Sequence, residues 1–247
     1  MILPPDTGWD VFTALLAVSF ATSFTTAAFG IGGGVALLAV LASLLPPAAL
    51  IPVHGVVQFG SNLGRMGLLI RHVDWPLVTA FALGSVIGAG LGGAFAVQLP
   101  PGGVQIGVGL FILWSVAFRP PAFLRRQGAV TGAVSTFLTM FFGATGPFVA
   151  AYLKSRDLGR YAFVATHATM MTLQHVFKTL AFGLLGFAFA PWLPLIAGMI
   201  ATGFLGTLAG KRVLGVTTDA RFHVALNFIL TLLALRLVWA GLADLRG

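Results

Sequence analysis

Long apolar runs without charge constrain this chain more than any other feature. Several runs of 18 or more residues contain no charged side chain, which is the pattern of helices that cross a lipid bilayer. Charged residues make up only 8% of the chain, against about 25% in soluble domains, and the mean hydropathy is +0.99. We therefore predict an all-α polytopic membrane protein with no soluble domain.

The charge distribution points to topology rather than to nucleic acid. The net charge is +8, and basic residues collect in the cytoplasmic loops of membrane proteins. The chain has no Glu and no Cys, so thiolate metal sites and disulfides are excluded. Its Asp residues all fall near a terminus or in an expected loop, at positions 6, 10, 74, 157, 219 and 244. We expect no carboxylate in the membrane core.

Glycine, proline and charged breaks divide the chain into ten apolar segments. These segments are 9–29, 33–45, 48–70, 76–98, 103–118, 127–142, 146–153, 161–185, 192–210 and 220–244. Two of them, 33–45 and 146–153, are too short to cross a hydrocarbon core of about 30 Å comfortably. The alternatives for these two are a re-entrant segment, paired as a hairpin with the segment before it, and a full crossing.

The chain also resembles itself after a shift of 113 residues. Phe29-Gly30 then falls on Phe142-Gly143 and His54 on His167. Arg65 falls on Lys178. Matches in this order indicate a duplicated unit. We assign a first repeat to residues 1–118 and a second to residues 119–247.

The basic loops orient these repeats, because positive loops face the cytoplasm. The loops on both sides of the pair 127–153 are basic, so this hairpin enters and leaves on the inside, turning at GATGP. The pair 9–45 then turns at GIGGG from the outside, where both termini are expected. A hairpin plus three spans is an odd number of crossings, so the second repeat is inverted, as in many secondary transporters.

Each glycine break is followed by a helix start, which exposes unpaired N–H groups and the positive end of a helix dipole. This predicts an anion site at Gly32, Gly33 and Gly34, and a second helix start at Thr145 and Gly146. Pro147 suits a first helical turn. The alternative is that these glycines serve only tight turns and close packing.

Two helices carry polar stripes at helical spacing. The predicted binding residues are His54, Gln58, Asn62 and Arg65 on segment 48–70, and His167, Gln174, His175 and Lys178 on segment 161–185. With no carboxylate expected nearby to neutralise the two cations, an anionic substrate is the favoured partner. The alternatives are that the cations reach toward the membrane surface and that the histidines are hydrogen-bonded core residues.

The order of FGIGGG, the short helix after it, the proline bend and the weaker copy FGATGP resembles the TauE/SafE family of sulfite and organosulfonate exporters. The resemblance spans about residues 10–240 and implies a bacterial inner-membrane carrier of small sulfur oxyanions or sulfonates such as sulfoacetate. Gly30, Gly32, Gly33 and Gly34 match the first glycine motif of the family. Gly143, Gly146 and Pro147 match the second, in which Thr145 departs from the more glycine-rich form.

Together these features predict a non-enzymatic secondary transporter of a small anion that works by alternating access. The expected partners are the anion, the lipid bilayer and a coupling proton or cation, without nucleic acid, cofactor or metal. The alternatives are an anion channel, a carrier of another small carboxylate or sulfur oxyanion, a membrane enzyme with histidine-bound metal, and a scaffold.

Overall fold

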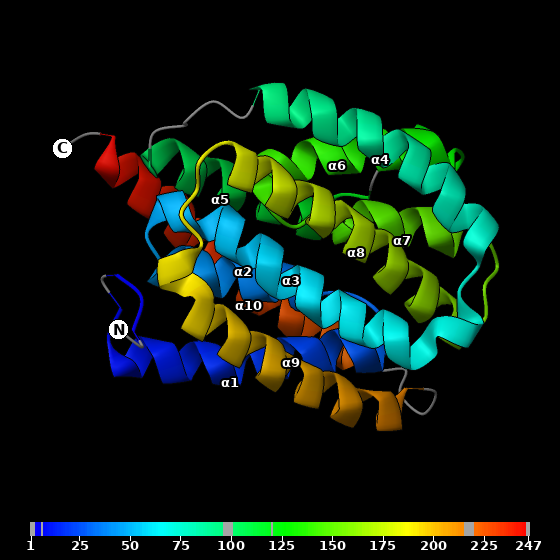
Figure 1. Cartoon of the computed structure of the whole chain (residues 1–247), viewed down its shortest axis with the longest axis horizontal. Coiled ribbons are helices and arrows are strands. Elements are labelled where there is room, and N and C mark those ends of the chain that lie inside the picture. The colour runs from blue at the N-terminus through cyan, green and yellow to red at the C-terminus, as the bar shows by residue number, and fades with distance from the viewer. Residues whose placement is uncertain (1–2, 6, 96–100, 120, 215–219, 246–247) are drawn as a thin grey trace.

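The helices of the computed structural model lie along one common direction (Figure 1). The structure describes residues 3–5, 7–95, 101–119, 121–214 and 220–245. Within these residues the chain forms ten α-helices, which are Trp9–Phe29 (α1), Gly33–Leu44 (α2), Pro47–Leu69 (α3), Trp75–Phe95 (α4), Pro101–Ala117 (α5), Gly128–Phe142 (α6), Gly146–Lys154 (α7), Arg160–Leu184 (α8), Leu193–Val213 (α9) and Ala220–Asp244 (α10).

The ten predicted segments agree with these helices to within a few residues. Prolines mark several starts, with Pro47 beginning α3 and Pro147 and Pro194 in the first turns of α7 and α9. Proline is tolerated there because those N–H groups have no intrahelical partner. The predicted end of segment 76–98, the loop residues 99 and 100, and Asp219 lie outside the described residues.

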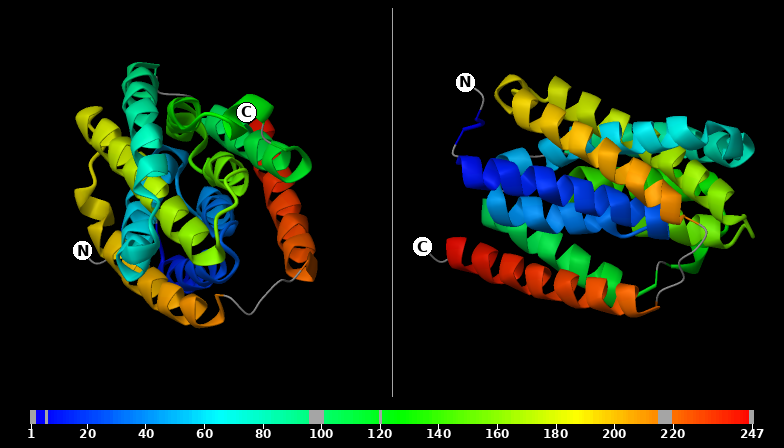
Figure 2. Two further views of the ribbon diagram at one scale, coloured as in Figure 1. Left: turned by 90° about the vertical axis from the view of Figure 1, so that its right-hand side faces the viewer. Right: turned by 90° about the horizontal axis from the view of Figure 1, so that it is seen from below.

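The prediction of a polytopic membrane protein is confirmed. Four of the described helical stretches are long and apolar enough to cross a bilayer, namely Trp9–Phe29, Trp75–Ala94, Ala190–Val213 and Asn227–Asp244. Helices α3 and α8 have 23 and 25 residues. They are as long as these four, but their polar stripes lower their hydropathy. These two helices pack against each other (Figures 1 and 2).

Close packing between the two halves of the chain depends on small residues. Helix α1 packs along α9, and α4 packs along α6. A Cβ atom on Gly84 would collide with the backbone carbonyl of Ala129, and one on Gly206 would collide with that of Phe20. Glycine therefore allows the backbones to approach, as ridges of small residues do between membrane helices.

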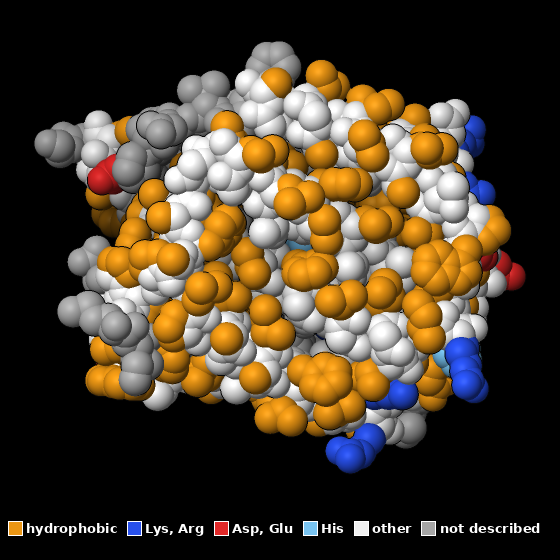
Figure 3. Space-filling view, in the orientation of Figure 1, with side chains coloured by type: hydrophobic (Ala, Val, Ile, Leu, Met, Phe, Trp, Pro, Cys, Tyr) orange, Lys and Arg blue, Asp and Glu red, His pale blue; other side chains and the backbone are white. Residues whose placement is uncertain are grey.

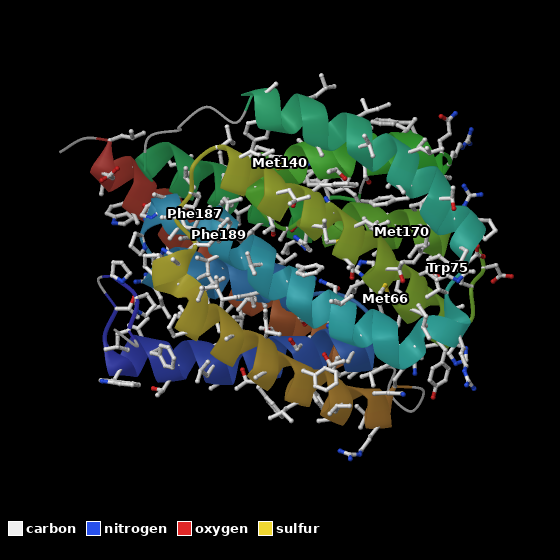
Figure 4. The ribbon with its side chains drawn as sticks, viewed as in Figure 1. Met66, Trp75, Met140, Met170, Phe187 and Phe189 are labelled. Carbon is white, nitrogen blue, oxygen red and sulfur yellow. The ribbon has the colours of Figure 1, made fainter. Side chains whose placement is uncertain are left out.

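The two ends of the bundle differ in charge. Lys and Arg side chains gather at one end (Figure 3), where α3 leads into α4 and α7 into α8. Helix α1 begins and helix α10 ends at the opposite end (Figure 1). Figure 4 places Trp75 at the basic end and Phe187 and Phe189 at the other. Tryptophan is typical of membrane–water interfaces, so Trp75 suits an anchoring position at the basic end.

The second hairpin begins and ends at the basic end. The Arg156 guanidinium donates a hydrogen bond to the backbone oxygen of Arg126, with 2.6 Å between Nη2 and O. This bond joins the segment before α6 to the one after α7. The first hairpin, α1 and α2, begins and ends at the terminal end (Figures 1 and 2). The two hairpin tips therefore approach each other from opposite ends of the bundle.

Candidate functional site

Each hairpin tip turns at glycines with positive φ. Gly30 and Gly32 have φ of 87° and 101°, and Gly143 has φ of 79°. Side chains with a Cβ rarely adopt this conformation, whereas glycine does so freely. Glycine at these positions therefore lets the chain end one helix and start the next within three residues.

The other tip glycines differ in what they face. A Cβ on Gly33 would collide with the Thr22 carbonyl of α1, so Gly33 is a packing residue. A Cβ on Gly34 would lie 3.3 Å from Nε2 of Gln58, and one on Gly146 would lie 3.7 Å from Nε2 of His167. Gly34 and Gly146 thus face the polar stripes of α3 and α8.

The tips and stripes line a cavity of about 30 Å³, which is room for about two water molecules. Among the described residues, its lining is Thr26, Ile31, Gly32, Gly34, Val35, His54, Gln58, Asn62, Ala144, Gly146, Pro147, His167, Met171 and His175. None of these carries a carboxylate. Eight of the predicted binding residues line it; the other five, Gly33, Arg65, Thr145, Gln174 and Lys178, do not.

The two helix starts offer unequal numbers of backbone donors. The first turn of α2 leaves the amides of Gly33, Gly34 and Val35 without intrahelical acceptors, and bonding along the helix resumes with Ala36 N to Gly32 O at 3.0 Å. At α7, Pro147 has no N–H, and the Phe148 amide already donates to Thr145 O at 3.0 Å. The first tip therefore has more backbone N–H groups without an intrahelical acceptor than the second tip has.

A histidine from each half bonds a carbonyl of its own tip. His54 Nε2 lies 3.1 Å from Gly34 O, and His167 Nε2 lies 3.3 Å from Gly146 O. A carbonyl oxygen can only accept, so Nε2 is assigned as the donor in both rings. In the neutral ring, Nδ1 is then left as an acceptor. A similar pairing occurs in both halves, with the carbonyl 20 residues before His54 and 21 residues before His167.

Lys178 reaches across the molecule to the neighbourhood of His54. Its side chain is fully buried. Its Nζ lies 3.0 Å from the carbonyl oxygen of Gly143 and 3.4 Å from Nδ1 of His54. The side chain passes over Gly55, where a Cβ would come within 2.9 Å of Lys178 Cε. The ammonium therefore sits behind the cavity wall, with His54 between it and the cavity.

Two side-chain amides, those of Asn62 and Gln58, connect Arg65 with the cavity by hydrogen bonds. Arg65 Nη1 donates to Asn62 Oδ1 at 2.9 Å, and Asn62 Nδ2 donates to Gln58 Oε1 at 3.1 Å. Each group orients the next, because hydrogen bonds in series polarise one another. The oxygen of Gln58 is held by Asn62, so its amide nitrogen is the end left to act as a donor toward the cavity.

Arg65 itself lines a separate narrow crevice toward the basic end, together with Thr207 and Lys211. It is 2% exposed, and its Nε has no hydrogen-bond partner among the described residues. The guanidinium therefore lies between the central cavity and the end of the bundle that carries the basic loops.

Thr145 and Gln174 brace the second tip rather than face the cavity. Gln174 Nε2 donates to the carbonyl of Ser135 at 2.7 Å and to Thr145 Oγ1 at 2.5 Å. Thr145 Oγ1 in turn donates to the same carbonyl at 3.0 Å. These bonds tie α6, the tip and α8 together, so the threonine that departs from the glycine-rich motif has a structural role here.

The third histidine lies at the cavity with a free nitrogen. His175 is 1% exposed, and its Nδ1 has no hydrogen-bond partner among the described residues. Its ring meets that of His54 edge to face, with 5.8 Å between centroids. Across the described part of the chain, no group of three His, Cys, Asp or Glu residues is placed to hold a metal ion.

The residues missed by the sequence analysis are mostly neighbours of the motif glycines. Ile31, Val35, Ala144 and Pro147 line the cavity through their place in the tips. Thr26 is different, because it belongs to a stripe on α1 that also contains Ser19, Thr22 and Ser23. Their spacing of three or four residues marks one helical face, and this signal was present in the sequence.

One family model matches most of the chain. The family model of the sulfite exporter TauE/SafE matches residues 15–237. No curated protein and no solved structure matches the chain. The matched range runs from within α1 to within α10 and includes every residue that lines the cavity. The chain therefore belongs to the sulfite exporter TauE/SafE family.

Proposed function

We propose that this protein is a secondary transporter that carries a small anion, either sulfite or an organosulfonate such as sulfoacetate. Family membership makes it a membrane transporter. The observation that carries the choice of an anion is the cavity between the tips. It combines the free amides of α2, the donor end of Gln58 and two buried cations behind its walls, and no described lining residue has a carboxylate.

The donor set suits a sulfonate or sulfite head group. Such a group presents three oxygen acceptors, and backbone amides at a helix start supply donors that already point at a bound anion. A cavity of about 30 Å³ is too small for a whole organosulfonate. We infer that the described arrangement is closed, and that the hairpins separate to admit the substrate.

The packing of the helices supports an inverted repeat over residues 1–118 and 119–247. In such a repeat, helices α1 to α5 correspond in order to α6 to α10. The α1–α9 contact then corresponds to the α6–α4 contact, and both contacts are present. The pairs α3–α8 and α5–α10 map onto themselves. Such symmetry gives two equivalent ways of closing the cavity, one toward each side of the membrane, which is the basis of alternating access.

We place the protein in the bacterial inner membrane with the basic end cytoplasmic and both termini periplasmic. The chain has no native cysteine, so single cysteines can be introduced without background. A cysteine at Arg126 should react only with reagent on the cytoplasmic side, and one at Leu185 only from the periplasm. The reverse pattern would refute this orientation.

Counterflow in proteoliposomes tests the function. Vesicles loaded with unlabelled sulfite should transiently accumulate labelled sulfite from outside, because a carrier exchanges one molecule for another. An anion channel would only equilibrate the label. A parallel series with sulfoacetate, taurine, thiosulfate and acetate would rank the substrates. Acetate exchange without exchange of any sulfur anion would overturn the proposed substrate class.

A further inference from the structure

Lys178 is a buried cation that anion binding in the cavity does not use directly. Its ammonium has one carbonyl and one histidine nitrogen as partners. In the part of the chain that the structure describes, it forms no ion pair with a carboxylate. Charged groups within a membrane are costly and are typically functional, and their partners show what they do. The partner here is His54.

His54 connects Lys178 with the cavity. The histidine lines the cavity, whereas the lysine does not. Nδ1 of His54 faces Nζ at 3.4 Å, while Nε2 faces the Gly34 carbonyl at 3.1 Å beside the free amides of α2. The two ring nitrogens thus face opposite sides. A proton received at Nδ1 can leave from Nε2, and the ring then ends in its other neutral tautomer.

Few other groups compete for this proton. The titratable side chains that face Lys178 are His54 from α3 and His175, one turn earlier on α8. His167 and Arg65 lie farther toward the basic end, beside each other. Among the other elements packed against α8, helices α4 and α6 have no ionisable residue. The ionisable residues of α7 and of segment 70–72 are Tyr152, Lys154, Arg71 and His72.

The two halves differ at this position in a chemically important way. Lys178 corresponds to Arg65 under the shift of 113 residues. A guanidinium stays protonated inside a protein, whereas a buried amine can give up its proton. Arg65 also has side-chain oxygens of Asn62 and Ser61 as acceptors, at 2.9 and 3.4 Å. One half therefore holds a fixed charge and the other an exchangeable one.

We propose that Lys178 is the binding site of a coupling proton, which it exchanges with the cavity through His54. This rests on the proposed function and names its coupling ion. With an anion in the cavity, Lys178 is protonated and the two charges offset each other. Without the anion, the Nζ proton passes to Nδ1 of His54, and the Nε2 proton leaves to cavity water. Lys178 is then neutral, and anion and proton move together in the same direction.

The test uses sulfoacetate in proteoliposomes, with the membrane potential clamped. Sulfoacetate stays fully ionised near neutral pH, so its own protonation does not mimic coupling. Wild type should exchange labelled sulfoacetate at equal pH and accumulate it several-fold when the outside is made more acidic. Lys178→Arg keeps the charge but cannot release it. Lys178→Gln is permanently neutral and can still donate to Gly143. Both variants should exchange the label but accumulate none.

Proton uptake provides a second readout. In detergent and weak buffer, sulfoacetate binding should draw a proton from solution per anion in wild type and none in either variant. Lys154→Arg, an exposed basic residue at the end of α7, is the matched control and should behave as wild type. Failure of wild type to exchange sulfoacetate would refute the proposed function for this anion and the proton site with it.

Other outcomes would overturn the proton site alone. These are exchange by wild type without any response to the pH gradient, or gradient-driven accumulation by either variant. A folded variant that neither binds nor exchanges would assign Lys178 to the anion itself instead.

Discussion

Replacing Gly146 by alanine should reduce the volume of the cavity without disturbing the fold. The added Cβ would lie 3.7 Å from His167 Nε2 and 4.0 Å from Met171 Cε, which are ordinary van der Waals contacts. Gly146 is the first residue of α7 and does not have positive φ. Alanine should therefore be accepted, and Gly→Ala at a compatible site raises the free energy of unfolding by about 0.4–1 kcal/mol.

The affinity for the anion should fall, whereas the stability of the fold should not. The cavity measures about 30 Å³, so a methyl group takes a large part of it and displaces one oxygen of the anion. Losing one such polar contact costs about 1–3 kcal/mol, which is a roughly 5- to 150-fold higher Kd. We expect Gly146→Ala to melt at or above the wild-type temperature in detergent while its counterflow KM for sulfite rises by that factor.

The control is Gly67→Ala on α3, whose Cβ would meet nothing within 4 Å. By the same Gly→Ala effect it should also melt at or above the wild-type temperature, but it should leave the KM near wild type. Wild-type sulfite binding by Gly146→Ala would show that the cavity is not the anion site. A melting temperature well below wild type would show that the packing around Gly146 leaves no room for a methyl group.

Three further predictions test other parts of the site. Gln58→Leu should raise the KM for sulfite roughly 10-fold or more, because one charge-assisted donor is worth about 1.5–3 kcal/mol; an unchanged KM would remove Gln58 from the site. Gln174→Leu should lower the free energy of unfolding by about 1–3 kcal/mol by leaving the Thr145 tip unbraced, and denaturant unfolding with unchanged stability would contradict this. Pro147→Ala restores an N–H at the second tip, so it should lower the Kd for sulfite by up to about 10-fold; isothermal titration showing an unchanged Kd would mean that this tip does not contact the anion.

The sequence was sufficient to predict the helices and their breaks, because long uncharged runs and glycine or proline punctuation act locally. It also correctly predicted the polar stripes on α3 and α8, since a period near four residues fixes which side chains share a face. Eight of the predicted site residues therefore meet at one cavity.

The direction of individual groups was not predictable in the same way. Gly33 and Gly34 are adjacent, yet one faces the Thr22 carbonyl of α1 and the other faces Gln58. This difference depends on how α2 is rotated against α1, which tertiary packing decides. A bulky residue at Gly33 would therefore disturb the helix contact and would not report on the anion. The position of the Lys178 ammonium likewise depends on a hydrogen bond to the carbonyl of Gly143, 35 residues earlier in the chain.

The two hairpin tips differ in chemistry, and this difference suggests that they have different roles in transport. The first tip has three backbone amides without intrahelical acceptors. Arg65, whose charge is fixed, is connected to the cavity beside this tip through Asn62 and Gln58. The second tip has fewer backbone donors, because Pro147 has no N–H. Lys178 donates to the Gly143 carbonyl of this tip, and its proton can be exchanged through His54. A symmetric pair of anion tips would hold the substrate equally well with or without a proton. With one tip for the anion and one exchangeable cation, occupancy of the cavity becomes sensitive to protonation, and the unequal chemistry of the two tips can couple the anion to a proton.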